Sequence, residues 1–443
     1  MPAQYQISGS TAAAISLSIE ELLAGTVLAP GELLPPIRTL ADELSVSAGT
    51  VAAAYRLLAQ RGLVVSDGRR GTRLRSMRRD AAPVRRSQTV AARDGAIDLS
   101  SGAPDPELLP DLTERLPHLR YEPATYGSPP ILPQLAERAR SRFAVDGVPA
   151  THLTCSFGAL DGIMRVLSSS LRPGDRVALE DPGWPSLLDA VQLAGLLPIP
   201  LALDPSGPLP DSLWDALAAG ARAVVVTSRA QNPTGACLDR ARATELSSVI
   251  KRYPAALLIE DDHGGQVAGA RLCSMGDGSL PRWVVVRSLA KSYGPDLRLA
   301  LLAGDPTTIA RVDEGLASGA GWVSHLIQAL AVSLWSDPAI DRLLDRAAST
   351  YGARREALVS ALGENGIGVT AETGLNVWVP VADEAGCVAA MSTEGYLVTP
   401  GTRFRIASPP AVRLTAGLLA VEAAPRVAAS LVRAMQASPH TRV

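Results

Sequence analysis

Short runs of consecutive apolar residues recur along the chain from about residue 170 onward, and longer segments with helical spacing separate them. Runs that lack polar alternation are typical of parallel strands buried on both faces by helices. The predicted strands are 176–179, 223–227, 256–259, 283–286 and 299–302. The pattern therefore predicts an α/β fold with a mostly parallel sheet.

The first 75 residues follow a different pattern, with three helical stretches before two short apolar segments. Ser47 is a plausible N-cap for the third helix, because serine side chains accept hydrogen bonds from a first-turn N–H. The predicted elements are helices near 15–23, 37–44 and 48–61, the last ended by Gly62, and strands 63–65 and 72–74 joined by a turn at Asp67-Gly68. This order is that of a winged helix-turn-helix.

A change in composition separates these two regions. Between Arg69 and Arg86 lie eight arginines and one acidic residue, Asp80, without hydrophobic periodicity. Such a stretch is typical of a linker. We therefore predict a winged helix-turn-helix domain over 1–75, an arginine-rich linker over 76–97 and a larger domain over 98–443.

Composition excludes several classes of protein. The net charge of −2 argues against a globally basic nucleic-acid protein, although a local basic patch remains compatible with it. The four cysteines are scattered without metal-ligand spacing, so we expect neither a metal site nor a disulfide framework. No signal peptide and no membrane span are evident. These features predict a cytoplasmic protein.

Lysine is nearly absent: of the 42 lysines and arginines, only Lys251 and Lys291 are lysines. Arginine can replace lysine as surface charge, but its guanidinium group is never deprotonated in proteins and cannot attack a carbonyl. Lys291 follows the apolar run 283–286, which makes it a candidate Schiff-base former. Lys251 closes an amphipathic segment and fits a surface position.

Polar residues stand where several predicted strands end. They are Asp181, Asn232, Asp261 and Lys291. Ligands of open parallel sheets collect at the carboxyl ends of the strands. The sequence therefore predicts a ligand site at this edge of the sheet.

The N-terminal region resembles the DNA-binding domain of GntR-type transcription factors. The matching residues are Pro30-Gly-Glu-Leu-Leu-Pro35, Arg38, Leu44-Ser-Val-Ser47, Thr50-Val51, Tyr55 and Gly62-Leu63. The resemblance implies that the third helix enters the major groove and that the wing contacts the DNA backbone or minor groove. The residues it places at the DNA are Arg38, Ser47, Thr50, Arg69, Arg70 and Arg73. Arginine suits both phosphates and guanine edges.

From about Asp98 onward the chain resembles fold-type I aminotransferases, which bind pyridoxal 5′-phosphate. The matching motifs, in the family's order, are Ser156-Phe-Gly158-Ala159, Glu180-Asp-Pro-Gly-Trp184, Asn232-Pro-Thr-Gly235, Asp261, Ser288-x-x-Lys291, Arg298 and Arg413. Each motif alone is weak evidence, since Asn-Pro-Thr-Gly can be a simple turn and Asp261 a helix cap. Their joint order is hard to produce by chance.

The resemblance implies a role for each motif. Gly158, Ala159, Ser288 and Arg298 would hold the cofactor phosphate, partly through N–H groups at a helix N-terminus. Trp184 would stack on the pyridine ring, Asn232 would bind its phenolic oxygen, and Asp261 would keep its nitrogen protonated. Lys291 would form the Schiff base. Arg413 would grip the carboxylate of an amino compound.

Two positions depart from the family pattern. His263 stands where related proteins carry a tyrosine that bonds the phenolic oxygen, so the electronics of the bound cofactor are expected to differ. Tyr126 lies near the position of a tyrosine that reaches the phosphate of the partner subunit, but Pro130 stands where a glycine is expected.

A GntR-type domain joined to an aminotransferase-like domain is the architecture of the MocR subfamily of bacterial regulators. Gly158–Gly162, Asp261–His263 and Trp322–His325 are most similar to its PtsJ-type members. The resemblance implies a homodimer that binds double-stranded DNA and senses pyridoxal phosphate or an amino compound, for example in vitamin B6 metabolism. It implies sensing rather than turnover. The alternatives are a working aminotransferase with an accessory DNA-binding domain and a cofactor-carrying scaffold.

Overall fold

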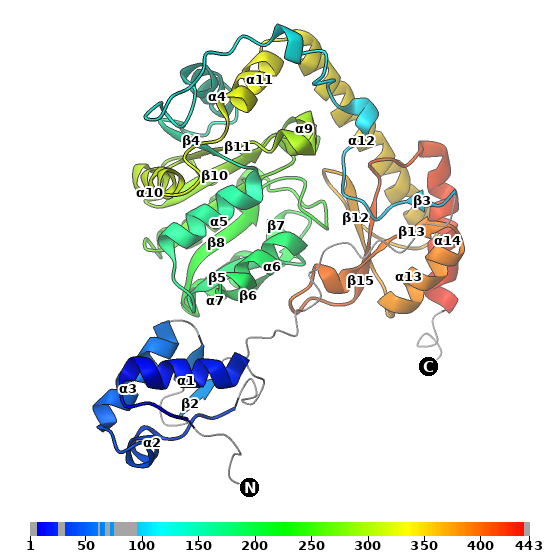
Figure 1. Ribbon diagram of the computed structural model, residues 1–443. Coiled ribbons are helices and arrows are strands. Elements are labelled where there is room, and N and C mark those ends of the chain that lie inside the picture. The colour runs from blue at the N-terminus through cyan, green and yellow to red at the C-terminus, as the bar shows by residue number, and fades with distance from the viewer. Residues whose placement is uncertain (1–6, 25–31, 61–62, 67–70, 75–94, 438–443) are drawn as a thin grey trace. The chain divides into compact units, whose positions relative to one another are not determined.

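The protein forms two compact units that divide near Ser87. A computed structural model describes residues 7–24, 32–60, 63–66, 71–74 and 95–437 (Figure 1). The division falls inside the stretch predicted as a linker, whose own boundaries stay predictions. Within the described residues, no helix is long and apolar enough to cross a membrane.

The N-terminal unit contains three helices and a two-stranded antiparallel sheet (Figure 1). Its elements are α1 (Ala12–Ala24), α2 (Ile37–Glu43), α3 (Ala48–Gln60), β1 (Val64–Ser66) and β2 (Thr72–Leu74). The predicted winged helix-turn-helix order is confirmed. Gly62 and the predicted turn at Asp67-Gly68 lie outside the described residues.

The apolar face of α3 holds this unit together. Val51, Ala54 and Leu58 are fully buried, because residues three to four positions apart lie on one side of a helix. Ser47 caps the helix as predicted, since its Oγ accepts a hydrogen bond from Thr50 N at 3.0 Å. The exposed face of α3 is thereby held in a fixed orientation.

The larger unit is built around an eight-stranded sheet in the order β4-β11-β10-β9-β8-β5-β6-β7. Its strands are β4 (His152–Ser156), β5 (Arg176–Asp181), β6 (Leu197–Asp204), β7 (Gly207–Pro208), β8 (Ala221–Thr227), β9 (Leu257–Asp262), β10 (Trp283–Ser288) and β11 (Ala300–Gly304). β11 and β7 run antiparallel to their neighbours, and the other pairs are parallel. The predicted mostly parallel sheet is confirmed, with β4, β6 and the short β7 added to the five predicted strands.

Helices cover this sheet (Figure 1). They are α4 (Pro133–Val145), α5 (Ala159–Ser170), α6 (Pro185–Leu193), α7 (Pro210–Ala218), α8 (Arg240–Lys251), α9 (Ala290–Tyr293), α10 (Pro306–Ala317), α11 (His325–Trp335) and α12 (Pro338–Glu364). Every residue of β9 and β10 is buried, as expected for strands covered on both faces. Polar side chains at the ends of these strands therefore lie in a region sheltered from water.

A smaller C-terminal lobe packs at the far end of the long helix α12 (Figure 1). Its elements are β12 (Asn376–Pro380), α13 (Glu384–Thr393), β13 (Tyr396–Leu397), β14 (Thr399–Pro400), β15 (Ala411–Thr415) and α14 (Ala424–Ala437), with β3 (Ile97–Asp98) pairing beside β13. Short 3-10 helices are η2 (Pro106–Leu108), η3 (Leu116–His118), η4 (Gly265–Ala268), η5 (Pro295–Leu297), η6 (Gly401–Arg403) and η7 (Val421–Ala423). β12, β15 and β14 form a sheet with its own hydrophobic core. This lobe carries Arg413 on β15.

Candidate functional site

Lys291 lies in α9, three residues beyond the end of β10. Its Nζ donates a hydrogen bond to the carbonyl oxygen of Gly102. Burial, together with the positive charge of Arg413, lowers the pKa of Lys291 from 10.5 to about 8. A substantial fraction of this amine is therefore neutral, and nucleophilic, in mildly alkaline solution. Lys251, in contrast, is exposed at the end of α8.

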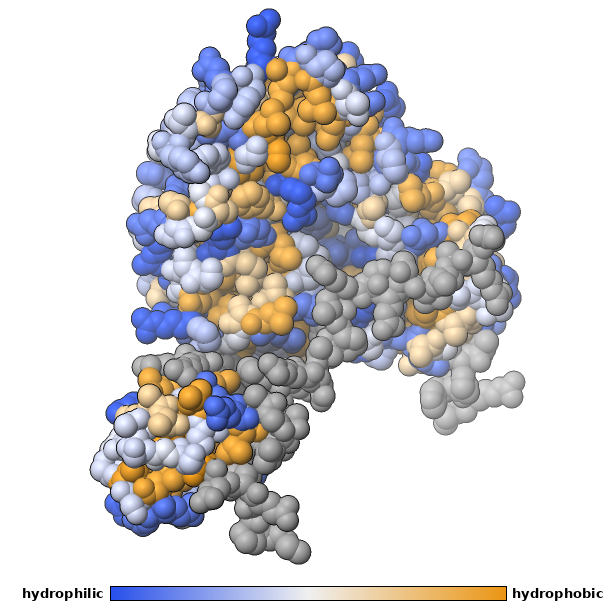
Figure 2. All heavy atoms as spheres, viewed as in Figure 1, coloured by the Kyte–Doolittle hydropathy of each residue, from blue (hydrophilic) through white to orange (hydrophobic). Residues whose placement is uncertain are grey.

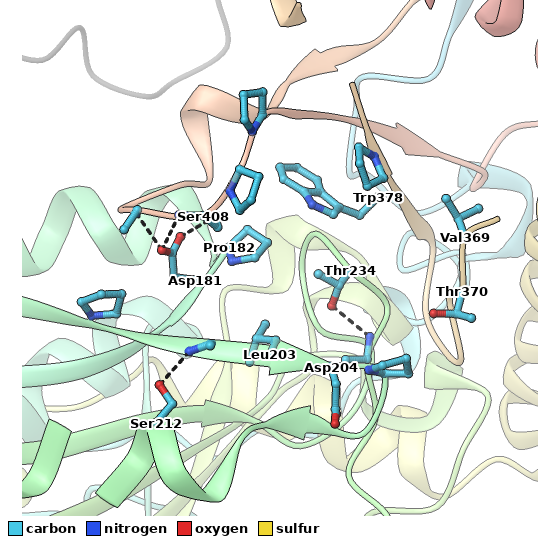
Figure 3. A pocket seen from close by; sticks show the side chains of 18 of the residues that line it. Asp181, Pro182, Leu203, Asp204, Ser212, Thr234, Val369, Thr370, Trp378 and Ser408 are labelled. Carbon is cyan, nitrogen blue, oxygen red and sulfur yellow. Dashed lines mark hydrogen bonds between the residues drawn. The ribbon is translucent and has the colours of Figure 1, made fainter. Parts of the chain in front are cut away.

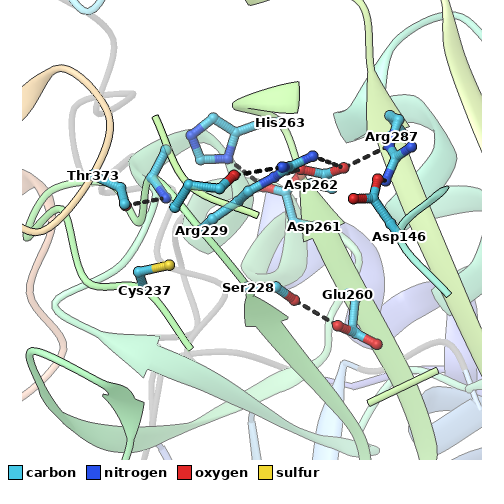
Figure 4. Close-up of polar contacts among 12 residues, drawn as sticks. Asp146, Ser228, Arg229, Cys237, Glu260, Asp261, Asp262, His263, Arg287 and Thr373 are labelled. Atoms are coloured by element: carbon cyan, nitrogen blue, oxygen red, sulfur yellow. Dashed lines mark hydrogen bonds and ion pairs between the residues drawn. The ribbon is translucent and has the colours of Figure 1, made fainter. Parts of the chain in front are cut away.

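Asp261 lies one residue before the end of β9 and is 2% exposed. Its Oδ2 is 3.0 Å from Nδ1 of His263 (Figure 4). Its Oδ1 is buried and has no hydrogen-bond partner among the described residues. Buried carboxylate oxygens are normally hydrogen-bonded, so Oδ1 is placed to accept a bond from an N–H group of a ligand.

His263 stands where the family pattern has a tyrosine, as the sequence shows, and the structure reveals its partner. The family pattern puts a tyrosine there, bonded to the phenolic oxygen of the cofactor. In the structure the imidazole ring of His263 is held by Asp261 instead. The shorter side chain of histidine and its ring nitrogen allow this contact, which a tyrosine hydroxyl would not make in the same way.

Asn232 and Arg413 are far apart in sequence but meet in the structure. Arg413 Nη1 donates to Asn232 Oδ1 at 3.1 Å, and Asn376 Nδ2 donates to the same oxygen at 3.2 Å. Arg413 also donates through Nη2 to the carbonyl oxygen of Ser100. Burial, together with the positive charge of Arg403, lowers the pKa of Arg413 from its ordinary value. An anionic ligand would offset this unfavourable burial of charge.

Three of the residues expected to hold a phosphate, Gly158, Ala159 and Arg298, lie at the N-terminus of α5. Gly158 is the N-cap, with a φ of 97° that favours glycine, and the buried Ala159 begins the helix. Arg298 Nη2 donates to the Phe157 carbonyl oxygen at 3.1 Å, and a Cβ atom on Gly158 would lie 3.4 Å from this guanidinium. The buried Ser288 accepts a hydrogen bond from Ala290 N at 3.2 Å. Helix N-termini with nearby arginine are suited to anions.

A buried ion-pair network supports the site from the other face of β9 (Figure 4). Asp262 is fully buried and binds two arginines, Arg229 at 2.7 Å and Arg287 at 2.6 Å. Arg287 also binds Asp146 at 2.6 Å. Neighbouring strand residues point to opposite faces. Asp261 therefore faces the candidate site, while Asp262 forms an ion pair with Arg287 that links β9 to β10. The motifs did not predict this network, although the consecutive Asp261 and Asp262 at the end of a strand were a signal for it.

Three of the residues singled out from the sequence lie apart from these contacts. Trp184 is half-buried and its carbonyl oxygen caps the start of α6. Tyr126 is 96% exposed and packs edge-on against Trp322, with 6.1 Å between ring centroids. Asp181 ends β5 as predicted, but its carboxylate is held by the backbone of residues 406–408 rather than turned toward Asp261.

The N-terminal unit presents its expected DNA-contact residues at its surface. Arg38 is exposed on α2, and Arg73 is exposed on β2. Ser47 Oγ also lies 2.9 Å from Oγ1 of the half-buried Thr50, so the two hydroxyl groups form one polar point at the start of α3. Arg69 and Arg70 lie outside the described residues.

Comparison with known proteins agrees with this arrangement. Residues 94–430 match the family aminotransferase class I and II, and residues 11–74 match the bacterial regulatory proteins of the gntR family. The vitamin B6 salvage pathway transcriptional repressor PtsJ of Salmonella typhimurium is 38% identical over 91% of this chain and 93% of its own length. The pyridoxine biosynthesis transcriptional regulator PdxR of Corynebacterium glutamicum is 28% identical over 78% of this chain and 77% of its own.

Solved structures show the same fold for the larger unit. The multiple substrate aminotransferase of Thermococcus profundus superimposes with a TM-score of 0.73 at 20% identity, over 82% of this chain and 96% of that protein. At this level of identity the likeness concerns the fold, not the chemistry.

Proposed function

Since this chain belongs to the MocR subfamily of GntR-type regulators, we propose that it is a transcription regulator whose DNA binding responds to the site around Lys291. The signal is pyridoxal 5′-phosphate or an amino compound captured there, and the regulated process is vitamin B6 metabolism. The observation that carries this proposal is the presence, in one chain, of an arginine-bearing winged helix, a half-buried lysine with a lowered pKa, and a buried Asp261 oxygen without a partner among the described residues.

The residues present fit pyridoxal phosphate. The orphan Asp261 Oδ1 suits the protonated ring nitrogen, which needs a buried acceptor. Gly158, Ala159, Ser288 and Arg298 form the cradle for the phosphate at the start of α5. Asn232 lies in the loop that follows β8 and accepts a hydrogen bond from Arg413. We assign it to the phenolic oxygen.

Bound pyridoxal phosphate supplies an aldehyde that captures primary amines. Toward that chemistry, Lys291 offers an amine whose pKa of about 8 keeps part of it unprotonated. Asp261 would hold a proton on the ring nitrogen, and the contact of His263 Nδ1 with its Oδ2 fixes the orientation of the carboxylate. Arg413 would bind the carboxylate of an amino compound through a bidentate contact, and the half-buried Trp184 is assigned to the ring by the family motif alone.

DNA recognition is assigned to the N-terminal unit. Arg38, Arg69, Arg70 and Arg73 neutralise phosphates, while Ser47 and Thr50 place the start of α3 at the base edges. The DNA-binding domain ends at residue 75, and the larger domain begins at residue 98.

The regulator works as a homodimer in the cytoplasm. Figure 2 shows hydrophobic side chains gathered over α11 on the larger unit. The exposed Tyr126 and Leu326 belong to that region, and they support a subunit interface there.

A sensing role is favoured over catalytic turnover because the relatives named above are regulators, and an enzyme does not need the arginine-bearing domain. The second candidate is an aminotransferase that uses the same lysine. It is favoured by the intact set of Lys291, Asp261 and Arg413. Repeated turnover of an amino acid with a keto acid would support the aminotransferase over the regulator that only senses its ligand.

The test is DNA binding with and without the cofactor. Full-length protein freed of pyridoxal phosphate, and the same protein reloaded, are titrated onto the promoter of its own gene. We expect the two affinities to differ in the wild type and in Lys251→Ala, and to be equal in Lys291→Ala, which keeps the fold but cannot hold the cofactor covalently. Absence of DNA binding in every form would reject the proposal.

A further inference from the structure

A cavity lies in the larger unit between two groups of elements (Figure 3). Its volume is about 670 Å³, which is enough for a small organic molecule. One wall comes from the neighbouring strands β5 and β6 and the start of α7. The other comes from β12, the loop before it and the 407–410 loop. The cavity therefore lies between the main sheet and the C-terminal lobe.

The turn from Asn232 to Gly235 separates this cavity from the cofactor site. Asn232 contacts Arg413 on one side of the turn, whereas Thr234 and Ala236 line the cavity on the other. Neither Lys291 nor Arg413 is among the described lining residues. A ligand in the cavity would therefore not compete for the contacts assigned to pyridoxal phosphate.

The walls of the cavity are mostly apolar and rigid. Trp378 presents its indole ring, and the prolines that line the cavity are Pro182, Pro200, Pro205, Pro380, Pro409 and Pro410. Proline and tryptophan change shape little on binding, so little conformational entropy is lost when a ligand is enclosed. Faces of this kind suit a hydrophobic body, and the tryptophan ring also attracts cations.

The ionisable groups of the cavity are all acidic. No lysine, arginine or histidine is among the described residues that line it, although the chain is rich in arginine. Asp181 is held by three backbone N–H groups and by Ser408 Oγ at 2.8 Å, and Asp204 is paired with Arg242 at 2.7 Å. Glu372 is exposed and has no hydrogen bond or ion pair among the described residues.

From this charge pattern we propose that the cavity binds a small organic cation with a hydrophobic body, such as an arylalkyl amine. The cation would lie between the Trp378 ring and the Glu372 carboxylate. Anions, including phosphate esters, are disfavoured because no basic side chain is among the described residues that line the cavity, whereas Glu372 lines it and forms no ion pair with any of them. The proposal goes beyond the cofactor site and does not depend on DNA binding.

The cavity also has a direct packing connection to Arg413. Trp378 and Arg413 are paired across β12 and β15. The Phe404 ring lies between them, with its centroid 5.7 Å from that of Trp378 and 4.9 Å from the Arg413 guanidinium carbon. Only the Phe404 ring therefore separates a ligand that contacts Trp378 from Arg413, the residue assigned to the carboxylate of the amino compound.

The experiment is calorimetric titration of full-length protein loaded with pyridoxal phosphate. The probe is benzyltrimethylammonium, a quaternary amine that cannot react with the cofactor aldehyde. Uncharged benzyl alcohol and anionic phenylacetate are the matched probes. We expect one molar equivalent of the cation to bind at least about tenfold more tightly than either of them.

Two variants test the location. Ala202 is exposed and lines the cavity, so Ala202→Trp fills the space without removing a contact and should abolish binding. Glu372→Gln should weaken cation binding about tenfold. Glu364→Gln, at an exposed position outside the cavity, should leave it unchanged. Absence of cation binding, equal affinity for the three probes, or binding that survives Ala202→Trp would overturn the proposal.

Discussion

At the scale of single residues, the Lys291 amine should set the pH dependence of cofactor attachment. Burial and the positive Arg413 lower its pKa to about 8. The neutral fraction of the amine then rises about tenfold between pH 7 and pH 9. We expect the rate at which pyridoxal phosphate attaches to the apoprotein, followed by visible absorbance, to rise with a midpoint near pH 8 and to level off above it.

Arg413→Gln provides the control for this pH profile. Removing a positive neighbour favours the protonated amine, so the midpoint should move to higher pH. Borohydride reduction of the loaded protein should label Lys291 and leave the exposed Lys251 unmodified. A profile that keeps its midpoint in Arg413→Gln, or labelling of Lys251, would contradict this account.

Motifs reveal side chains of the site but not its backbone contacts. Lys291 was singled out because arginine cannot supply its chemistry, Asp261 because it follows an apolar run and matches a family motif, and Arg413 because it matches the family pattern. The carbonyl oxygens of Gly102 and Ser100, which accept hydrogen bonds from Lys291 and Arg413, left no signal because every residue has one. The His263 contact with Asp261 was missed because the family position predicts a residue's place but not its partner.

At the scale of elements, the ion pairs of Asp262 should stabilise the junction of β9 and β10. Burial alone would raise the pKa of Asp262, but the positive Arg287 and Arg229 outweigh it and hold this pKa below its ordinary range. Asp262→Asn leaves two buried guanidinium groups without this carboxylate. We expect the free energy of unfolding, measured by denaturant titration, to fall by about 3–5 kcal/mol.

The half-exposed pair of Asp341 with Arg142 serves as a comparison, because its side chains are 49% and 24% exposed. Asp341→Asn should cost at most about 1 kcal/mol. Since the pKa of Asp262 is depressed in the folded protein, its contribution is present above the unfolded value of about 4 and is lost as the pH falls below it. The difference between wild type and Asp262→Asn should therefore shrink in acid. A constant difference would argue against an ionic contribution.

The sequence predicts some strands of the main sheet better than others. The apolar runs in β8, β9 and β10 have no polar interruption and are fully or almost fully buried. β6 contains Pro198 and Pro200, which argue against a central strand, and it lies near the sheet edge where proline is tolerated. β4 is short and carries His152, Thr154 and Ser156, so its burial follows from tertiary packing rather than from its own pattern.

At the scale of the whole molecule, DNA binding should depend steeply on salt. Neutralised phosphates release counterions, so the slope of log affinity against log salt concentration is about −0.9 per phosphate contacted. Arg38→Ala and Arg73→Ala each remove an exposed charge of the N-terminal unit and should flatten the slope by about 0.9. Arg240→Ala, exposed on α8 of the larger unit, should not change it. Equal slopes in all three variants would place the DNA contacts elsewhere.

Communication between the two units imposes a quantitative condition on any effector. If pyridoxal phosphate changes the affinity for the operator by some factor, the operator must change the affinity for pyridoxal phosphate by the same factor. Couplings of this kind usually amount to about 1–3 kcal/mol, or about 5–150-fold. We expect the two factors to agree when DNA affinity is measured by fluorescence anisotropy and cofactor affinity by visible titration with and without operator. Lys291→Ala should reduce both factors together.

If wild-type protein gives a factor of one in both titrations, the cofactor alone does not shift the population of DNA-binding states. The same pair of titrations repeated with amino acids on the loaded protein would then identify the effector, because only a compound bound through Arg413 should lose its effect in Arg413→Gln.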